Sequence, residues 1–235
     1  MHRGLHSRHL PARGELKSTS LHSTHSYDSG SIYFSAHPID VLLFQNPDLL
    51  HELYVLKCIT TVVFTSGDRG LAGDLPLSLE DGLGHAYSCM AGMESLAVGG
   101  TESSKVQLGE HEVQMWSPKS MPNVQVLYLR LPDGGHAGQG YDAHGNESLK
   151  KLYNKDIESI TTTDGNATYT LDAVKDIIAT VLRTRKARDV KILYHKGPLP
   201  RTEEDFDSEH ADHTICAKLV MDVIETEAIT VDVKE

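Results

Sequence analysis

The sequence has no long hydrophobic run. None of the apolar stretches in its 235 residues approaches the roughly 18–20 residues that are needed to cross a bilayer. The opening residues, Met1 to Arg13, also lack the apolar core of a signal peptide. We therefore expect a soluble protein without an integral membrane segment, in the cytoplasm rather than secreted.

Cysteine and clustered basic residues are also scarce. The three cysteines, Cys58, Cys89 and Cys216, are far apart and free of CxxC spacing, which excludes a disulfide framework or a zinc knuckle. Lys and Arg number 22 against 33 Asp and Glu, a formal charge of −11, and no basic block could follow a phosphate backbone. We expect a small-molecule substrate rather than nucleic acid, and the sequence does not indicate an oligomeric state.

The length favours one large domain. A single core can still grow to this size and bury roughly 70–75% of the surface of the unfolded chain. Residues 1–29 are rich in His, Ser and Arg without an apolar period, so we predict a flexible N-terminal arm followed by a single domain over residues 30–235. The histidines of the arm are irregularly spaced, which argues against a metal site there.

Strand and helix patterns alternate along this domain. Short β-prone runs predict strands at residues 31–36, 59–64, 124–131, 190–194 and 230–233. Apolar residues at helical spacing predict helices at about 47–56, 78–93, 171–182 and 214–226, the second of them opened by a capping box of Ser78 and Asp81. Strands that alternate with helices favour an α/β fold with a mostly parallel sheet.

Two clusters of histidine and aspartate lie at predicted strand ends. Ala36-His37-Pro38-Ile39-Asp40 follows the first strand, and His210-Ala211-Asp212-His213 lies between a late strand and a helix. Loops at the carboxyl ends of parallel strands meet at one edge of the sheet, so we expect the two clusters to lie together. Structural histidines at loop ends are the alternative interpretation.

Imidazole and carboxylate are the ligands of a catalytic zinc, which uses three protein groups and keeps one position open. His37, Asp40 and His213 would make such a set. His210 would then lie near the open position, where a protonated imidazole can stabilise an oxyanion, with Asp212 holding its orientation and charge.

The motifs resemble the GlcNAc-phosphatidylinositol de-N-acetylase family, also called PIG-L or LmbE-like, and look most like its fungal members. That family has Ala-His-Pro-Asp-Asp early and His-x-Asp-His late, and the resemblance extends from about Ser31 to Ile224. It includes the segments Val63 to Asp68, Ala86 to Gly92 and Leu129 to Gly134. The resemblance implies a Rossmann-like fold with helices on both faces of the sheet, and zinc-dependent removal of an N-acetyl group from a glucosamine-type substrate.

The resemblance assigns His37, Asp40 and His213 as zinc ligands and His210 with Asp212 as the pair that stabilises the oxyanion. The family's general base, the first aspartate of the Asp-Asp pair, falls at Ile39, which cannot accept a proton. A substrate-holding arginine of the family would fall near Ser78-Leu79-Glu80-Asp81, where none is present.

Zinc alone makes hydroxide available near pH 7, and a positioned base adds typically about 10²–10⁴-fold, so the loss at position 39 predicts a slow enzyme. Loop acids that could replace the base are Asp68, Asp133, Asp205, Asp207 and Glu209, each of which could equally be a solvated loop residue. Asp133 and Arg69 are the candidates for contact with substrate hydroxyls.

Two other functions stay open. The protein could be a pseudoenzyme or binding module that retains the metal without turnover. It could also be a repurposed metal-dependent enzyme, for example of secondary metabolism, in which Ile39 shapes an apolar substrate pocket.

Overall fold

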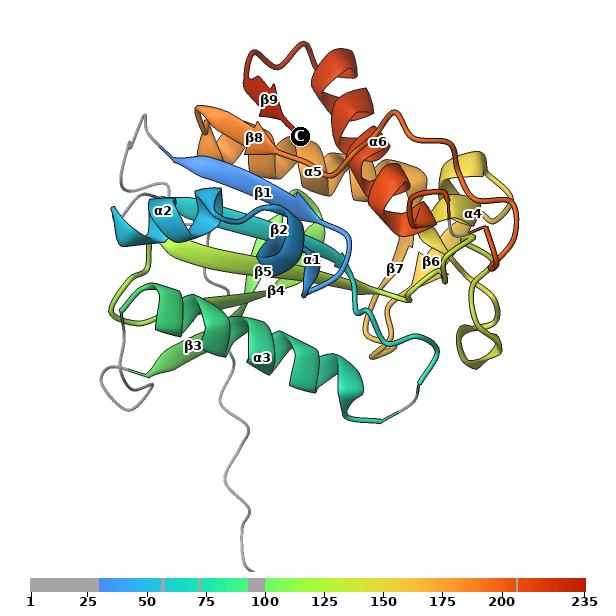
Figure 1. The fold of residues 1–235 in the computed structure, drawn as a ribbon, viewed down its shortest axis with the longest axis horizontal. Helices are drawn as coiled ribbons and strands as arrows, with labels where there is room; N and C mark the ends of the chain where they lie inside the picture. The colour runs from blue at the N-terminus through green and yellow to red at the C-terminus, as the bar shows by residue number, and fades with distance from the viewer. Residues whose placement is uncertain (1–29, 56–57, 72, 93–99, 206) are drawn as a thin grey trace, which may run out of the picture.

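The structure is a computed structural model that describes residues 30–55, 58–71, 73–92, 100–205 and 207–235. The arm predicted at residues 1–29 lies outside this part of the chain. The described residues form an α/β fold around a seven-stranded sheet in the order β3-β4-β5-β2-β1-β8-β9, shown in Figure 1. The predicted α/β class is therefore confirmed.

Five neighbouring strands of the sheet are parallel. They are β5 (Val124–Leu131), β2 (Ile59–Thr65), β1 (Ser31–Ser35), β8 (Asp189–Lys191) and β9 (Asp232–Lys234). An antiparallel hairpin of β3 (Thr101–Leu108) and β4 (His111–Pro118) pairs with the edge of β5. The sheet is thus mostly parallel, as its alternating pattern predicts. A separate two-stranded sheet joins β6 (Ser159–Thr161) and β7 (Thr168–Thr170).

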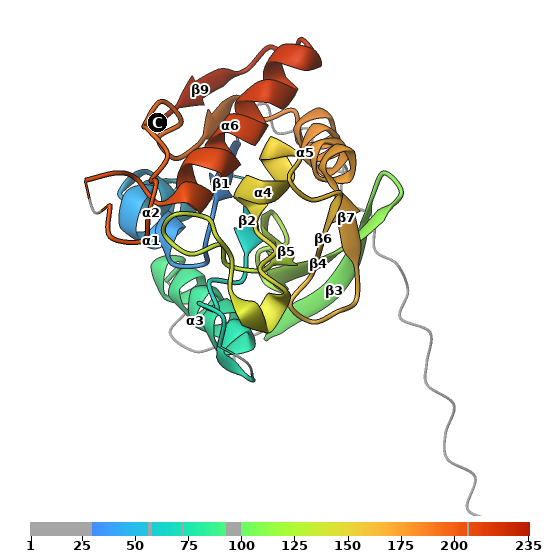
Figure 2. The same ribbon diagram turned by 90° about the vertical axis from the view of Figure 1, so that its right-hand side faces the viewer.

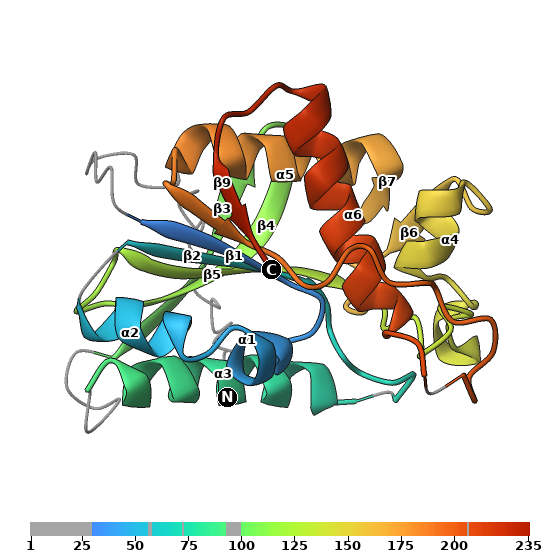
Figure 3. The same ribbon diagram turned by 45° about the horizontal axis from the view of Figure 1, so that its top comes forward.

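Helices cover both faces of the large sheet (Figure 3). One face carries α1 (Asp40–Phe44), α2 (Asp48–Tyr54) and α3 (Leu75–Met90), and the other carries α5 (Leu171–Arg185) and α6 (Ala211–Thr226). The short η1 (Asp142–His144) and α4 (Leu149–Asn154) belong to the segment between β5 and β6. Among the described residues, no helix is both long and apolar enough to span a membrane.

The pleat of the central strands divides the core between these layers. In β1, Ile32 and Phe34 join the cluster of buried residues around α5 and α6, whereas Tyr33 joins the cluster around α1, α2 and α3. All five residues of β1 and all seven of β2 are buried. Strands buried on both faces read as continuous apolar runs, which explains why these two strands could be predicted.

The direction in which the chain adds strands reverses beside β1. From β1 the chain moves to β2 and later to β5 on one side, and then returns to add β8 and β9 on the other. Ligands of open α/β sheets bind outside the carboxyl ends of the strands at such a switch point. Figure 2 looks onto this end of the sheet, where the loop after β1 and the start of α6 lie close together.

Two details of the helices differ from the sequence prediction. Helix α3 begins at Leu75 with Pro76 in its first turn, so Ser78 lies inside the helix and its hydroxyl donates to the carbonyl of Asp74 rather than forming a capping box. Helix α6 begins at Ala211 instead of 214. The earlier start places His213 in the first helical turn.

Candidate metal centre

The loop after β1 is folded tightly around one carboxylate. Ser35 donates its hydroxyl to the carbonyl of His37, at 2.8 Å. The backbone N–H of His37 donates to Asp40 Oδ2 at 2.7 Å, and its ring Nδ1 lies 2.9 Å from the same oxygen. The His-x-x-Asp spacing therefore brings the imidazole and the carboxylate together within a single turn of chain.

The second cluster is positioned by the start of α6. His210 is the N-cap residue, and its Nδ1 accepts the backbone N–H of Asp212 at 3.2 Å. An N-cap side chain commonly accepts an N–H group of the first turn, but this role usually belongs to Ser, Thr, Asp or Asn. The cap fixes His210 and directs the first turn of α6 toward the loop after β1.

Three ligand atoms from the two clusters form a compact triangle. His37 Nδ1 and Asp40 Oδ2 are 2.9 Å apart, Asp40 Oδ2 and His213 Nε2 are 3.1 Å apart, and His213 Nε2 and His37 Nδ1 are 3.3 Å apart. Ligands held tetrahedrally at about 2.0–2.2 Å from zinc stand about 3.3–3.6 Å from one another. The triangle thus fits a metal ion after a small expansion, and we refer to it as the metal triangle.

Each histidine of the metal triangle has a carboxylate close to its second ring nitrogen. Asp212 Oδ2 lies 3.4 Å from His37 Nε2 and accepts the backbone N–H of Gly134 at 2.8 Å. Glu209 Oε1 lies 2.8 Å from His213 Nδ1. A carboxylate on the second ring nitrogen orients a metal-binding histidine and raises its basicity. The arrangement is therefore that of histidines prepared to bind a cation.

Glycine is required beside this support. A Cβ atom at Gly134 would lie only 2.6 Å from Asp212 Oδ1. The backbone can approach the Asp212 carboxylate closely enough to donate its N–H because the residue has no side chain. This explains the first glycine of the Pro132-Asp133-Gly134-Gly135 turn.

We expect Glu209→Gln to lower the affinity for zinc by about 10–100-fold, because a neutral amide supports the basicity of His213 less well than a carboxylate. Isothermal titration with Zn²⁺ measures the change. Glu204→Gln is the matched control, since Glu204 is an exposed residue of the same loop. Equal affinities of the two variants would contradict the role of Glu209.

Asp133, in the loop that follows β5, and His210, at the N-cap of α6, both lie close to His37 or to each other at the edge of the metal triangle. Asp133 Oδ2 lies 3.8 Å from His37 Nε2, and Asp133 Oδ1 lies 4.0 Å from His210 Nε2. The ligand atoms of His37, Asp133, His210 and Asp212 lie within 4.8 Å of one another, as do those of His37, His210 and His213. This buried cluster of histidine and aspartate could hold a metal ion.

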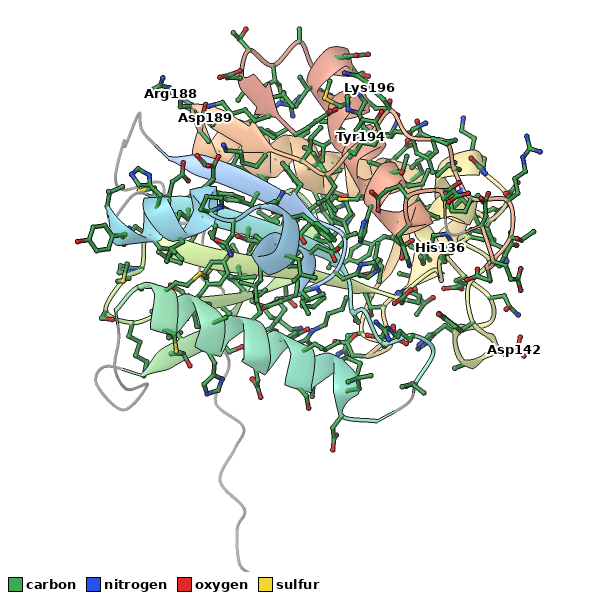
Figure 4. The ribbon with its side chains drawn as sticks, viewed as in Figure 1. His136, Asp142, Arg188, Asp189, Tyr194 and Lys196 are labelled. Carbon is green, nitrogen blue, oxygen red and sulfur yellow. The ribbon has the colours of Figure 1, made fainter. Side chains whose placement is uncertain are left out.

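Two acidic side chains, Asp68 and Glu203, accept backbone N–H groups of the loop that carries Asp133 and so fix its position. Asp68, which is fully buried after β2, accepts the backbone N–H of Asp133 at 3.1 Å and lies 2.7 Å from His144 Nε2. The two carboxylate oxygens of Glu203 accept the backbone N–H groups of His136 and Ala137, both at 2.9 Å. In Figure 4, His136 lies at the end of the sheet where α6 begins, away from Arg188 and Asp189 at the opposite end.

Charge pairing controls the protonation of the metal triangle. Burial disfavours the charged form of all three residues, but the contacts of Asp212 and Asp40 with His37 raise the pKa of His37 well above its ordinary value. Likewise the contact with Asp40 raises the pKa of His213, and His213 and His37 hold the pKa of Asp40 below its usual range. The carboxylate of Asp40 thus favours positive charge on its two neighbours, which is the charge that a bound cation would bring.

His210 behaves differently from the other two histidines. Burial, reinforced by His37 and His213, lowers its pKa to about 4, so the ring is neutral near pH 7. Because Nδ1 accepts the N–H of Asp212, the proton of the neutral ring is assigned to Nε2. The expectation of a protonated imidazole is therefore replaced by that of a neutral N–H donor.

The other residues singled out from the sequence have clear positions. Asp212 contacts His37 through its carboxylate and His210 through its backbone N–H. Ile39 is the N-cap residue of α1 and is 51% exposed. Arg69 is exposed, with a left-handed backbone, in the loop after β2. Burial, followed by the neighbouring Asp212, raises the pKa of Asp133.

Neither the comparison with known protein families nor the comparison with curated proteins gave a match. The candidate metal centre is therefore characterised by its own geometry: an α/β fold that gathers a buried cluster of histidine and aspartate at the carboxyl ends of its parallel strands.

Proposed function

We propose that this protein is a zinc-dependent hydrolase of the LmbE-like class that removes an N-acetyl or related amide group from a glucosamine-type substrate. The metal triangle is the observation that carries the proposal, because two imidazoles and one carboxylate are a ligand set that catalytic zinc uses. Metal analysis of the purified protein tests it directly. About one equivalent of zinc supports the assignment, and a metal-free protein that also fails to take up zinc would refute it.

The metal would supply two things at this site. A bound Zn²⁺ polarises an amide carbonyl and lowers the pKa of a coordinated water to about 7. The protein's residues prepare this chemistry: Asp212 and Glu209 orient the two imidazoles, and Asp40 provides the negative charge. Their carboxylates keep His37 and His213 in one geometry, so little reorganisation is needed when the cation binds.

His210 would stabilise the negative charge that develops on the amide oxygen. His210 Nε2 lies 4.0 Å from Asp133 Oδ1, beyond hydrogen-bond distance, so an oxyanion can accept its N–H instead. A neutral N–H donor that is fixed in place before the reaction contributes to catalysis in the manner of an oxyanion hole. The cap formed with Asp212 supplies this fixation.

The contacts of the five loop acids indicate which of them is available to replace the missing base. Asp68 is fully occupied by backbone N–H groups and His144, and Glu209 is bound to His213. Asp205 accepts the N–H of Arg201, and Asp207 is exposed. Asp133 alone of the five has its carboxylate within 4.0 Å of both His37 and His210.

We assign Asp133 to contact with a substrate hydroxyl. Its carboxylate faces the cluster, and its Oδ1 is held by the N–H of Gly135 at 2.8 Å. Hydrogen bonds to a charged group contribute about 1.5–3 kcal/mol, so Asp133→Asn should raise KM by roughly 10–100-fold with little change in kcat. Steady-state kinetics measure the split. A fall in kcat at constant KM would instead identify Asp133 as the replacement base.

The second candidate function is a metal-binding protein without turnover. The observation that favours it is Ile39, an apolar residue that is 51% exposed directly before the ligand Asp40. Such a protein would bind zinc at the metal triangle and release no amine. Measurement of zinc content together with amine release separates the two functions, because only the hydrolase gives both.

A further inference from the structure

A cavity lies at the end of the sheet that is opposite to the metal triangle. It has a volume of about 370 Å³ and lies between the last turn of α5, the amino ends of β1 and β8, and the segment that leads into β9. Helix α6 begins at the metal triangle and ends near this cavity, and its 16 residues span about 24 Å. We refer to it as the amino-end cavity.

The interior of the amino-end cavity is apolar. Its floor consists of core residues that are at most 4% exposed, and its walls of partly buried residues that pack against the same core. The floor residues are Ile32, Leu182 and Val190, and the wall residues are Ala187, Ile229 and Val231. Water finds few polar partners in a space with such a lining. The lining therefore favours an aliphatic ligand.

The rim of the cavity carries one positive charge that is not neutralised. Lys186 is the exposed C-cap residue of α5, and among the described residues its ammonium group has neither a hydrogen bond nor an ion pair. The other cation of the rim, Arg183, is paired with Glu227. The net charge of these three side chains is therefore +1.

The acids that lie next to the cavity in the sequence are paired with a different lysine. The Nζ atom of Lys234 lies 3.0 Å from Asp189 Oδ1 and 3.6 Å from Asp232 Oδ2. The exposed Thr230 adds a hydroxyl group to the lining. One free ammonium group and one hydroxyl suit a ligand with a single negative charge, whereas a phosphate dianion would lack a second free cation.

We propose that the amino-end cavity binds an unbranched alkyl carboxylate, with its chain among the apolar residues and its carboxylate at Lys186. A methylene group is about as large as a water molecule, whose share of liquid volume is about 30 Å³, so the cavity accommodates a chain of roughly ten carbon atoms. This site is separate from the metal triangle and does not depend on the proposed hydrolysis.

A series of fatty acids tests the length and the chemistry of the cavity. The titrations use metal-free protein, so that no carboxylate can bind to zinc. We expect the affinity to rise roughly 2–4-fold with each methylene group from hexanoate to decanoate, because each buried methylene adds a similar hydrophobic contribution. Tetradecanoate should bind no more tightly than decanoate, because the cavity is then full. An affinity that does not depend on chain length would overturn the proposal.

Ala187→Leu reduces the space for the chain. The substitution adds three carbon atoms to the wall, so the longest chain that still gains affinity should become about three carbon atoms shorter. A variant that keeps the chain-length dependence of the wild type would show that the chain binds elsewhere.

Lys186→Gln tests the contact with the carboxylate. We expect it to weaken the binding of decanoate by roughly 5-fold, as is typical for an exposed ion pair, and to leave the binding of 1-decanol unchanged. Lys155→Gln is the matched control, since Lys155 is the exposed C-cap residue of α4 and has the same left-handed backbone. Equal effects of the two variants, or decylamine binding as tight as that of decanoate, would overturn the assignment of a carboxylate.

Addition of one equivalent of Zn²⁺ separates the amino-end cavity from the metal triangle. The affinity for decanoate should stay the same when zinc is added, whether or not the protein releases amine. A change in this affinity would place the carboxylate at the metal triangle and overturn the proposal.

Discussion

Asp40→Asn is expected to abolish zinc binding and to reduce amine release by about 10³-fold or more. The substitution removes the only negative charge of the metal triangle, while the amide oxygen can still accept the backbone N–H of His37 that shapes the loop. Changes to groups that merely support a metal ligand cost about 10–100-fold in affinity, and loss of a ligand costs more. Metal analysis and a fluorescence assay for primary amine measure both effects.

The matched control for this experiment is Asp81→Asn, because Asp81 is an exposed residue of α3. The control should keep its zinc and its activity. If Asp40→Asn retained a full equivalent of tightly bound zinc, the metal would have to be held elsewhere. The metal triangle would then no longer explain the site.

Ile39→Asp is expected to raise kcat by roughly 10²-fold, because a positioned general base contributes about 10²–10⁴-fold. The change should not disturb folding. Ile39 is 51% exposed, so a carboxylate at this position stays in contact with water. The new carboxylate would stand next to Asp40, at the position that the proposed LmbE-like assignment gives to the general base. Steady-state kinetics on an N-acetylated glucosamine substrate measure the gain.

Ile39→Asn separates the base from the effects of size and polarity. Asparagine is as compact and as polar as aspartate, but it does not accept a proton near pH 7. A gain in Ile39→Asp that is absent in Ile39→Asn would establish that the wild-type protein lacks only this group. An unchanged rate in both variants would exclude the slow-enzyme account and favour a protein that binds metal without hydrolysis.

The buried centre of the fold could be predicted from the sequence, and its edge could not. Strands β1 and β2 are apolar because both of their faces are covered, so they stand out as runs. The hairpin of β3 and β4 lies at the edge of the sheet, and β3 buries only Val106 and Leu108. Its polar residues conceal the strand period, and the hairpin was not predicted for that reason.

The meeting of the two motifs could be predicted, but the contacts that support it could not. Carboxyl ends of parallel strands share one edge of a sheet, so His37 and His213 were expected to be close. The contact of Asp212 with His37 joins residues 175 positions apart, and no local pattern indicates it. By contrast, Glu209 and His213 are four residues apart, and this spacing was the available signal for their pairing.

Helix α6 begins three residues earlier than predicted because its N-cap residue, His210, is of an unusual type. The apolar period of this helix begins near Ile215, which suggested a start at 214. Histidine is not a typical N-cap residue, so the cap formed by His210 was not recognised. The same imidazole that caps the helix is the proposed oxyanion donor, and this proposed role would account for the atypical residue at the cap.

Amine release under control of the metal tests the central claim most directly. The protein is stripped with a chelator, divided, and assayed on N-acetylglucosamine and N,N′-diacetylchitobiose before and after addition of one equivalent of Zn²⁺. Our account predicts slow release that is absent from the stripped protein and restored by zinc in the wild type, but not in Asp40→Asn. Zinc that binds without producing any amine from either sugar would contradict the assignment as a hydrolase of these substrates.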